Sequence, residues 1–135
     1  MASCGLDRVT GEPLFDLAHV AQCLEVIFST RRGEMITEEE FGCGLPELLG
    51  RRITPELIPR YRMMLAAGIG AWEPRLKVLR TDGSGNTVQA VTLGQVKIAV
   101  IALYRPRGHL GDLTVEGGER TLLIGALGEI LRVTV

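Results

Sequence analysis

Aromatic residues are scarce in this sequence: one Trp, two Tyr and three Phe make up 4% of its 135 residues. Carbohydrate clefts and base-stacking surfaces depend on exposed aromatic rings, so neither kind of site is favoured. The net charge is also small, at −1, whereas a nucleic-acid-binding protein usually carries a basic face. We therefore expect protein partners and no nucleic acid.

Long hydrophobic runs are lacking as well, and we expect no secretory leader. The longest apolar run, 98–104, has the length of a strand, whereas a membrane helix needs about 20 apolar residues. The first five residues hold no basic segment followed by an apolar stretch. We expect a protein without a membrane partner, made and assembled in a cytoplasm. Its 46% hydrophobic content excludes a disordered chain, and its length fits one domain, 1–135.

Metal-ligand and nucleophile motifs are absent. The cysteines Cys4, Cys23 and Cys43 are odd in number and widely spaced, which suits neither a disulfide framework nor a zinc site. His19 and His109 are too few for a cluster, and neither accompanies a nucleophile motif. We predict no metal, no cofactor and ordinary thiols.

Two segments have the residue spacing of amphipathic helices. The first begins at Asp16, which we expect as its cap, and ends near 29–33. The second has Thr54 as its cap, Pro55 in the favoured first position, and Pro74 as its stop. Between them, 34–41 predicts a short strand or turn and 45–49 a helical turn. The apolar stripes of the two helices, spaced three and four residues apart, are Leu17, Val20, Ala21, Leu24, Ile27 and Phe28, then Leu57, Ile58, Tyr61, Met64, Leu65, Ile69 and Trp72.

After Pro74 the apolar period changes to two, which is typical of strands. A strand begins at Leu76, and 87–93 is interpreted as its return strand in a hairpin. The apolar segment 96–104 predicts a central strand. Two further strands are predicted at 121–124 and 130–135, with 125–128 as a link or a helical turn. The pattern predicts an α+β domain, with two helices on one face of a small, mostly antiparallel sheet, and a core that includes Leu24, Ile27, Leu65, Ile69, Trp72 and Val100.

Five short motifs between residues 5 and 104 occur together in a characteristic order. They are Gly5-Leu6-Asp7 with Thr10-Gly11, then His19-Val20-Ala21-Gln22, Thr30-Arg31-Arg32-Gly33-Glu34, Phe41-Gly42-Cys43-Gly44-Leu45 and Trp72-Glu73-Pro74-Arg75. In this order they resemble the baseplate wedge, or sheath-initiator, family of contractile tails. That family includes a related subunit of type VI secretion and is sometimes labelled lysozyme-like. The last 30 residues look longer than the family pattern.

The resemblance implies that Glu73, Pro74 and Arg75 dock the subunit onto the helical core bundle of the baseplate wedge. Pro74 fixes the corner between helix and strand, so we expect both charges to project from a rigid point. The planar fork of Arg75 suits carboxylates or the carbonyls at a helix end. Without the resemblance, the two charges would be interpreted as solvated residues at a helix stop.

The resemblance also implies that the sheet receives a strand from the first sheath subunits, by β-augmentation of an open edge. Our candidate edges are 88–93, with Val88 and Ala90, and 130–135, with Val133 and Val135. The implied place is the baseplate of a virion tail, with wedge core proteins, the sheath subunit and the tail tube or hub as neighbours. Ring symmetry implies six copies. The particle can be a phage, a bacteriocin-like tail or a secretion device.

A tail glycosidase, lysozyme-like, is the enzyme alternative. It needs two carboxyl groups about 5–10 Å apart across a sugar cleft. Glu38, Glu39, Glu40 and Glu73 are available, but a run of three acids is typical of a solvated surface, and only Phe41 adjoins it. We therefore predict that the chain is not an enzyme. A free-standing binding adaptor is a further alternative that only its partners would distinguish.

Overall fold

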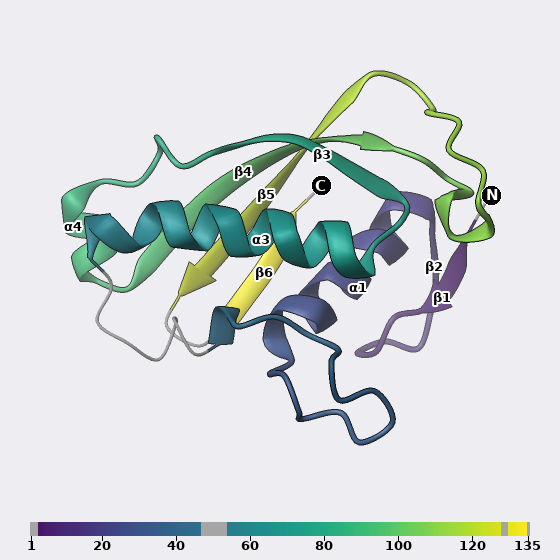
Figure 1. Ribbon diagram of the computed structural model, residues 1–135, viewed down its shortest axis with the longest axis horizontal. Helices are drawn as coiled ribbons and strands as arrows, with labels where there is room; N and C mark the ends of the chain where they lie inside the picture. The colour runs from purple at the N-terminus through teal and green to yellow at the C-terminus, as the bar shows by residue number, and fades with distance from the viewer. Residues whose placement is uncertain (1–2, 47–53, 128–129, 135) are drawn as a thin grey trace.

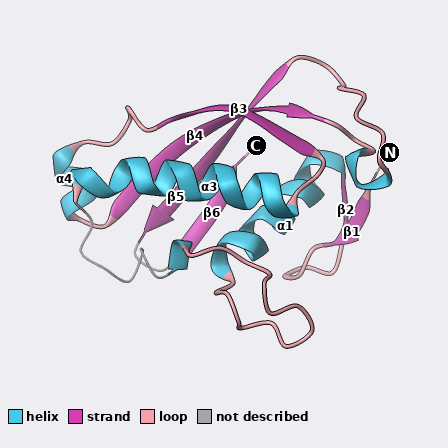
Figure 2. Ribbon diagram, viewed as in Figure 1, coloured by secondary structure: helices cyan, strands magenta, loops and turns pink. Residues whose placement is uncertain are grey.

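The computed structural model describes residues 3–46, 54–127 and 130–134. It is an α+β fold, as predicted, with two main helices on a four-stranded antiparallel sheet and a separate two-stranded hairpin (Figures 1 and 2). The elements are β1 (Cys4–Leu6), β2 (Pro13–Phe15), α1 (Asp16–Ser29), the 3₁₀ turn η1 (Pro55–Leu57), α3 (Ile58–Trp72), β3 (Leu76–Asp82), α4 (Val88–Thr92), β4 (Gln95–Tyr104), the 3₁₀ turn η2 (Gly108–Leu110), β5 (Glu119–Leu127) and β6 (Ile130–Thr134).

The sheet has the order β3-β4-β5-β6, so β3 and β6 are its edges. The central position predicted for 96–104 is confirmed, because β4 pairs with β3 on one side and β5 on the other. Both predicted C-terminal strands are present, and 125–127 extends β5. Across the described parts of the chain, no helix is both long and apolar enough to span a membrane.

The return strand predicted at 87–93 is wrong, because this segment contains the short helix α4. Thr87 caps the helix: its hydroxyl accepts a hydrogen bond from the amide of Ala90, at 3.1 Å. The side chain of Asn86 bonds both backbone groups of Lys97, at 2.7 Å each, which fixes the loop beside β4. The strand that returns along β3 is therefore β4, and Val88 and Ala90 are not on a sheet edge.

Local predictions around the helix starts need smaller corrections. Asp16 is the first residue of α1, with φ of 49°, and Phe15 occupies the cap position. Thr54 precedes η1 without a side-chain capping bond. The turn alternative holds for 34–41, whereas the predicted helical turn at 45–49 lies partly outside the described residues. The hairpin of β1 and β2 was not predicted.

The core lies between the two helices and one face of the sheet (Figure 1). Both predicted stripes point into it, and the alternate residues of β4 meet them. Trp72 is only partly buried, at the margin of the core, where its ring packs edge-on against Phe41 with the centroids 5.1 Å apart. The buried residues of the main elements include Val20, Leu24, Ile27, Phe28, Tyr61, Leu65, Ile69, Val96, Ile98, Val100, Leu122 and Ile124.

Truncating Leu65 should test this core. Leu65 is 1% exposed, so Leu65→Ala should lower the free energy of unfolding by about 2–5 kcal/mol, through lost burial and a cavity. Met63 lies on the same helix but is 68% exposed, and Met63→Ala should change it by less than about 0.5 kcal/mol. Urea denaturation measures both values. Equal losses in the two variants would contradict the assigned packing of α3.

Candidate functional site

The corner between α3 and β3 carries the predicted residues Glu73, Pro74 and Arg75. The helix ends at its last bond, from the amide of Glu73 to the carbonyl of Ile69, at 2.9 Å. Pro74 cannot donate the next helical hydrogen bond, so the chain turns there into β3. Pro74 is exposed, whereas Glu73 and Arg75 are 2% and 7% exposed.

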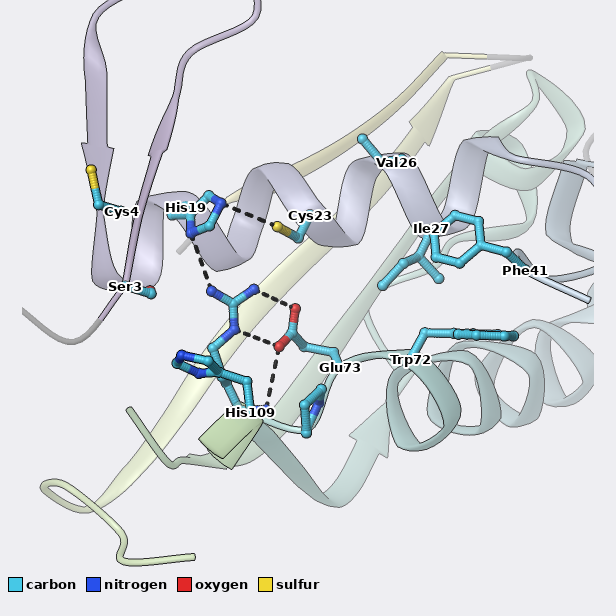
Figure 3. A pocket seen from close by; sticks show the side chains of 12 residues that line it. Ser3, Cys4, His19, Cys23, Val26, Ile27, Phe41, Trp72, Glu73 and His109 are labelled. Carbon is cyan, nitrogen blue, oxygen red and sulfur yellow. Dashed lines mark hydrogen bonds and ion pairs between the residues drawn. The ribbon is translucent and has the colours of Figure 1, made fainter. Parts of the chain in front are cut away.

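Glu73 and Arg75 bind each other. Nε of Arg75 lies 2.6 Å from Oε1 of Glu73, and Nη2 lies 2.8 Å from Oε2, which makes a two-pronged ion pair (Figure 3). The backbone amide of Arg75 also donates to Oε1, at 3.3 Å. The expectation that both charges project from the corner is therefore wrong for the isolated chain. Removing one partner of such a pair leaves a buried charge unpaired, which typically costs about 3–5 kcal/mol.

The electrostatics of the corner keep Arg75 charged. Burial by itself lowers the pKa of the Arg75 guanidinium, but the hydrogen bonds and the charge of Glu73 outweigh burial and raise the pKa above its usual value. A buried guanidinium is tolerated when a carboxylate satisfies its donors in this geometry. The two charges of the corner thus compensate each other through their hydrogen bonds.

His19 of α1 joins the corner from a distant part of the sequence. Its Nδ1 lies 3.1 Å from Nη1 of Arg75, and its Nε2 lies 3.6 Å from Sγ of Cys23 (Figure 3). A guanidinium can only donate, so Nδ1 is the acceptor and the neutral ring carries its proton on Nε2. Burial lowers the pKa of His19, and the nearby charge of Arg75 lowers it further. His19 therefore ties α1 to the corner in its neutral form.

Two glycines allow the backbone to approach this cluster. A Cβ on Gly5 of β1 would lie 2.5 Å from the ring of His19, and one on Gly108 of η2 would lie 2.2 Å from the carbonyl oxygen of Pro74. Real Cβ atoms do not approach so closely, and at Gly108 the obstacle is backbone. Hence β1 and η2 can close around the corner only because these positions lack a side chain.

A cavity of about 670 Å³ opens beside the corner. Figure 3 shows it between the start of the chain, α1 and the end of α3, with Glu73 on one side and Trp72 and Phe41 at the other end. We call it the corner cavity. Its lining is Ser3, Cys4, His19, Cys23, Val26, Ile27, Phe41, Trp72, Glu73, Pro74, Arg75 and His109. The sequence alone does not assign His19 and Cys23 to this site, although their spacing of four residues places them on one face of α1.

The predicted sheath-facing residues are not all on an edge. Val133 lies in the edge strand β6, and its amide donates to Oε1 of Glu25 in α1, at 3.1 Å. That amide therefore faces away from β5. Val135 lies outside the described residues, and Val88 and Ala90 belong to α4.

The four carboxylates considered for a glycosidase lie in two different environments. Glu38, Glu39 and Glu40 are exposed in turns, whereas Glu73 is buried with both oxygens bonded to Arg75. No group of three potential metal ligands forms within 3–46, 54–127 and 130–134.

The model of the family described as "Baseplate wedge protein gp25" matches residues 16–105. The chain belongs to this family. The match includes α1, α3 and the whole corner, so the predicted family is confirmed. A search of curated proteins finds no match for the sequence.

Two solved structures share the fold of this gp25-family chain. A provisionally named tail lysozyme of Geobacter sulfurreducens is 17% identical, with a TM-score of 0.60 over 84% of this chain and 94% of the other. A chain of the pyocin R2 baseplate, in its postcontracted state, is 22% identical, with a TM-score of 0.53 over 93% of this chain and 98% of the other. At such identities the likeness concerns the fold.

Acid should loosen the corner through His19. Its folded pKa lies below the usual 6.5, so its contribution to stability is complete above about pH 6.5 and is lost as the pH falls through the folded pKa. Arg75, Glu73, Cys23 and His109 face the ring. The melting temperature should fall less between pH 7.5 and 5.5 in His19→Gln than in the wild type, with His109→Gln as control. An identical fall in His19→Gln and the wild type would contradict this role.

Proposed function

We propose that this chain is a structural subunit of a contractile-tail baseplate that joins the wedge core to the first sheath ring, and that it is not an enzyme. The observation that carries this proposal is the family match over 16–105, which includes the Glu73–Arg75 corner. We infer several copies in a ring, six by resemblance, in the tail baseplate. Assembly in a host cytoplasm belongs to the same proposal.

The corner is the proposed contact with the wedge core. A buried ion pair on the surface of a mainly apolar cavity suits a preformed docking site, because the charges are already neutralised and oriented before a partner arrives. Pro74 is exposed at the turn, while Trp72 and Phe41 give the opposite end of the cavity an aromatic wall. A partner helix would meet these walls, and the pair would hold the turn in place beneath it.

Filling the corner cavity should prevent docking without disturbing the pair. His109 is exposed and lines the cavity, whereas its neighbour Leu110 is 72% exposed and does not. In co-purification with the wedge core proteins of the same particle, His109→Trp should weaken binding by about tenfold or more. Leu110→Trp should bind like the wild type.

A second variant, Glu73→Ala with Arg75→Ala, removes the pair altogether and should also fail to dock if a thermal melt shows that it folds. Normal assembly by His109→Trp and by the folded double variant would refute the docking site. Failure of the wild type to bind any wedge protein would refute the proposed function itself.

The proposed contact with the sheath is the outer edge of β6, the edge that does not pair with β5. Val133 is the residue we propose for it, and the predicted Val135 lies outside the described residues. An edge strand that pairs on one side only can accept a further strand, whose main-chain hydrogen bonds supply much of the affinity. The other predicted edge, at 88–93, contains the helix α4 and is therefore not a candidate for strand addition.

Val133→Pro should test this edge, because proline removes the outward amide and is tolerated on edge strands. We expect about tenfold weaker binding of the purified sheath subunit and unchanged binding of the wedge core, which serves as the internal control. Sheath binding equal to that of the wild type would exclude β6 as the edge. Loss of both partners would indicate a folding defect and would be checked by thermal melting.

A further inference from the structure

A groove runs beside β6, between that strand, α1 and the hairpin of β1 and β2. Its volume is about 820 Å³. Small residues of α1, Ala18 and Ala21, line it one turn apart, on the helix face that also carries Glu25. Residues 132–134 of β6 form the opposite wall. We call this space the β6 groove; the two alanines present only small side chains to it.

Glu25 occupies the position at this edge where the backbone of a further strand would be. Its Oε1 accepts the hydrogen bond from the Val133 amide, at 3.1 Å, and its Oε2 binds Nη2 of Arg8, at 3.0 Å. The Glu25 side chain is 17% exposed. One carboxylate oxygen thus replaces the carbonyl that a neighbouring strand would offer to Val133.

Gln22 of α1 holds the hairpin loop that carries Arg8. The backbone amide of Arg8 donates to Oε1 of Gln22, at 3.0 Å, and Nε2 of Gln22 donates to the carbonyl of Leu6, at 2.8 Å. Gln22 and Glu25 are three residues apart on the same face of α1. If the Glu25 carboxylate leaves the Val133 amide, Arg8 can still neutralise it. Displacing Glu25 therefore does not leave a buried charge unpaired.

The other edge of the sheet is closed more firmly. Arg62 of α3 donates to the carbonyl and hydroxyl of Thr81 in β3. The pairing of β3 with β4 also shifts register between Val78 and Arg80. Such a bulge twists an edge away from further pairing. The register of β6 with β5 is continuous from Leu127↔Ile130 to Leu123↔Thr134, which favours β6 as the accepting edge.

We infer that the β6 groove seats the incoming strand, and that Glu25 is a displaceable cap that keeps β6 closed until a backbone carbonyl of that strand takes over the Val133 amide. Charged side chains commonly protect edge strands from unwanted pairing. The identity of the strand, as a segment of the sheath subunit, rests on the proposed function. The cap is a property of the isolated chain.

Three variants separate the cap from its neighbours. Glu25→Ala leaves the Val133 amide without its acceptor, whereas Glu25→Gln keeps an oxygen that can accept but loses the charge. Arg8→Ala removes the ion pair and leaves the cap. Thermal melting shows whether each variant folds, and Glu25→Gln keeps the test decisive if Glu25→Ala does not.

Hydrogen exchange of the Val133 amide, followed by NMR on the full chain, measures the cap. Exchange in Glu25→Ala should be faster than in the wild type by about tenfold or more, because hydrogen bonds to charged groups are the stronger ones. Glu25→Gln should lie closer to the wild type than to Glu25→Ala. The amide of Val100, in the interior strand β4, serves as the control and should not change. Unchanged exchange at Val133 in Glu25→Ala would overturn the cap.

Titration with the purified sheath subunit measures the opening of the groove. Glu25→Ala should bind it several-fold more tightly than the wild type, because no cap has to be displaced. Equal or weaker binding by the folded variant would overturn the inference. If the wild type binds no sheath subunit, the proposed function fails and the sheath strand is excluded as the occupant of the groove. The hydrogen exchange of the Val133 amide still tests whether Glu25 caps β6.

Discussion

The buried ion pair between Glu73 and Arg75 determines how the parts of this molecule are arranged. Two charges taken out of water are stable only when they satisfy each other closely, and here the bonds of 2.6 and 2.8 Å do so. Because Pro74 separates the two residues, the pair also fixes the direction in which β3 leaves α3. The sheet is therefore attached to the helix layer at a set angle, beside the corner cavity.

The ion pair also contacts α1, through His19. This contact requires a particular protonation state of the histidine, in addition to the fixed direction of β3. Arg75 has only donors, so the histidine has to be neutral to accept from it. The neutral ring then connects α1 to the corner, while Gly5 and Gly108 let β1 and η2 pack against the cluster at distances that no other residue would permit. One ion pair thus organises three segments that are far apart in the sequence.

The features that the sequence predicted well are those set by local periodicity. Leu24 and Leu65 lie in the core because their helices have a clear apolar stripe, and β4 is central because it is apolar on both faces. The prediction of a strand at 87–93 is wrong because the Thr87 hydroxyl accepts a hydrogen bond from the Ala90 amide, which favours a helix over an extended strand.

Burial of charge was beyond prediction from the sequence, because the deciding partner is remote. His19 and Arg75 are 56 residues apart, and Glu25 and Val133 are 108 apart. In the sequence alone, Glu73 and Arg75 look like the exposed charges that commonly flank a helix stop. Only the packing of α1 against both the corner and β6 distinguishes a buried pair and a capped edge from solvated side chains.

The shared wall of the two candidate surfaces is α1. His19 and Cys23 face the corner cavity, while Ala18 and Glu25 face the β6 groove. The start of the chain is shared in the same way, because Cys4 lines the cavity and Arg8 the groove. The proposed role, holding two partners in register, needs a stiff connection between their contacts. Helix α1 is such a connection, because His19 fixes it at one surface and the Arg8–Glu25 ion pair, which remains when Val133 is released, fixes it at the other. Adjacency alone does not make the two surfaces communicate, since coupling requires an element with two arrangements. The bonds on both faces of α1 favour one arrangement, which suits a scaffold better than a switch.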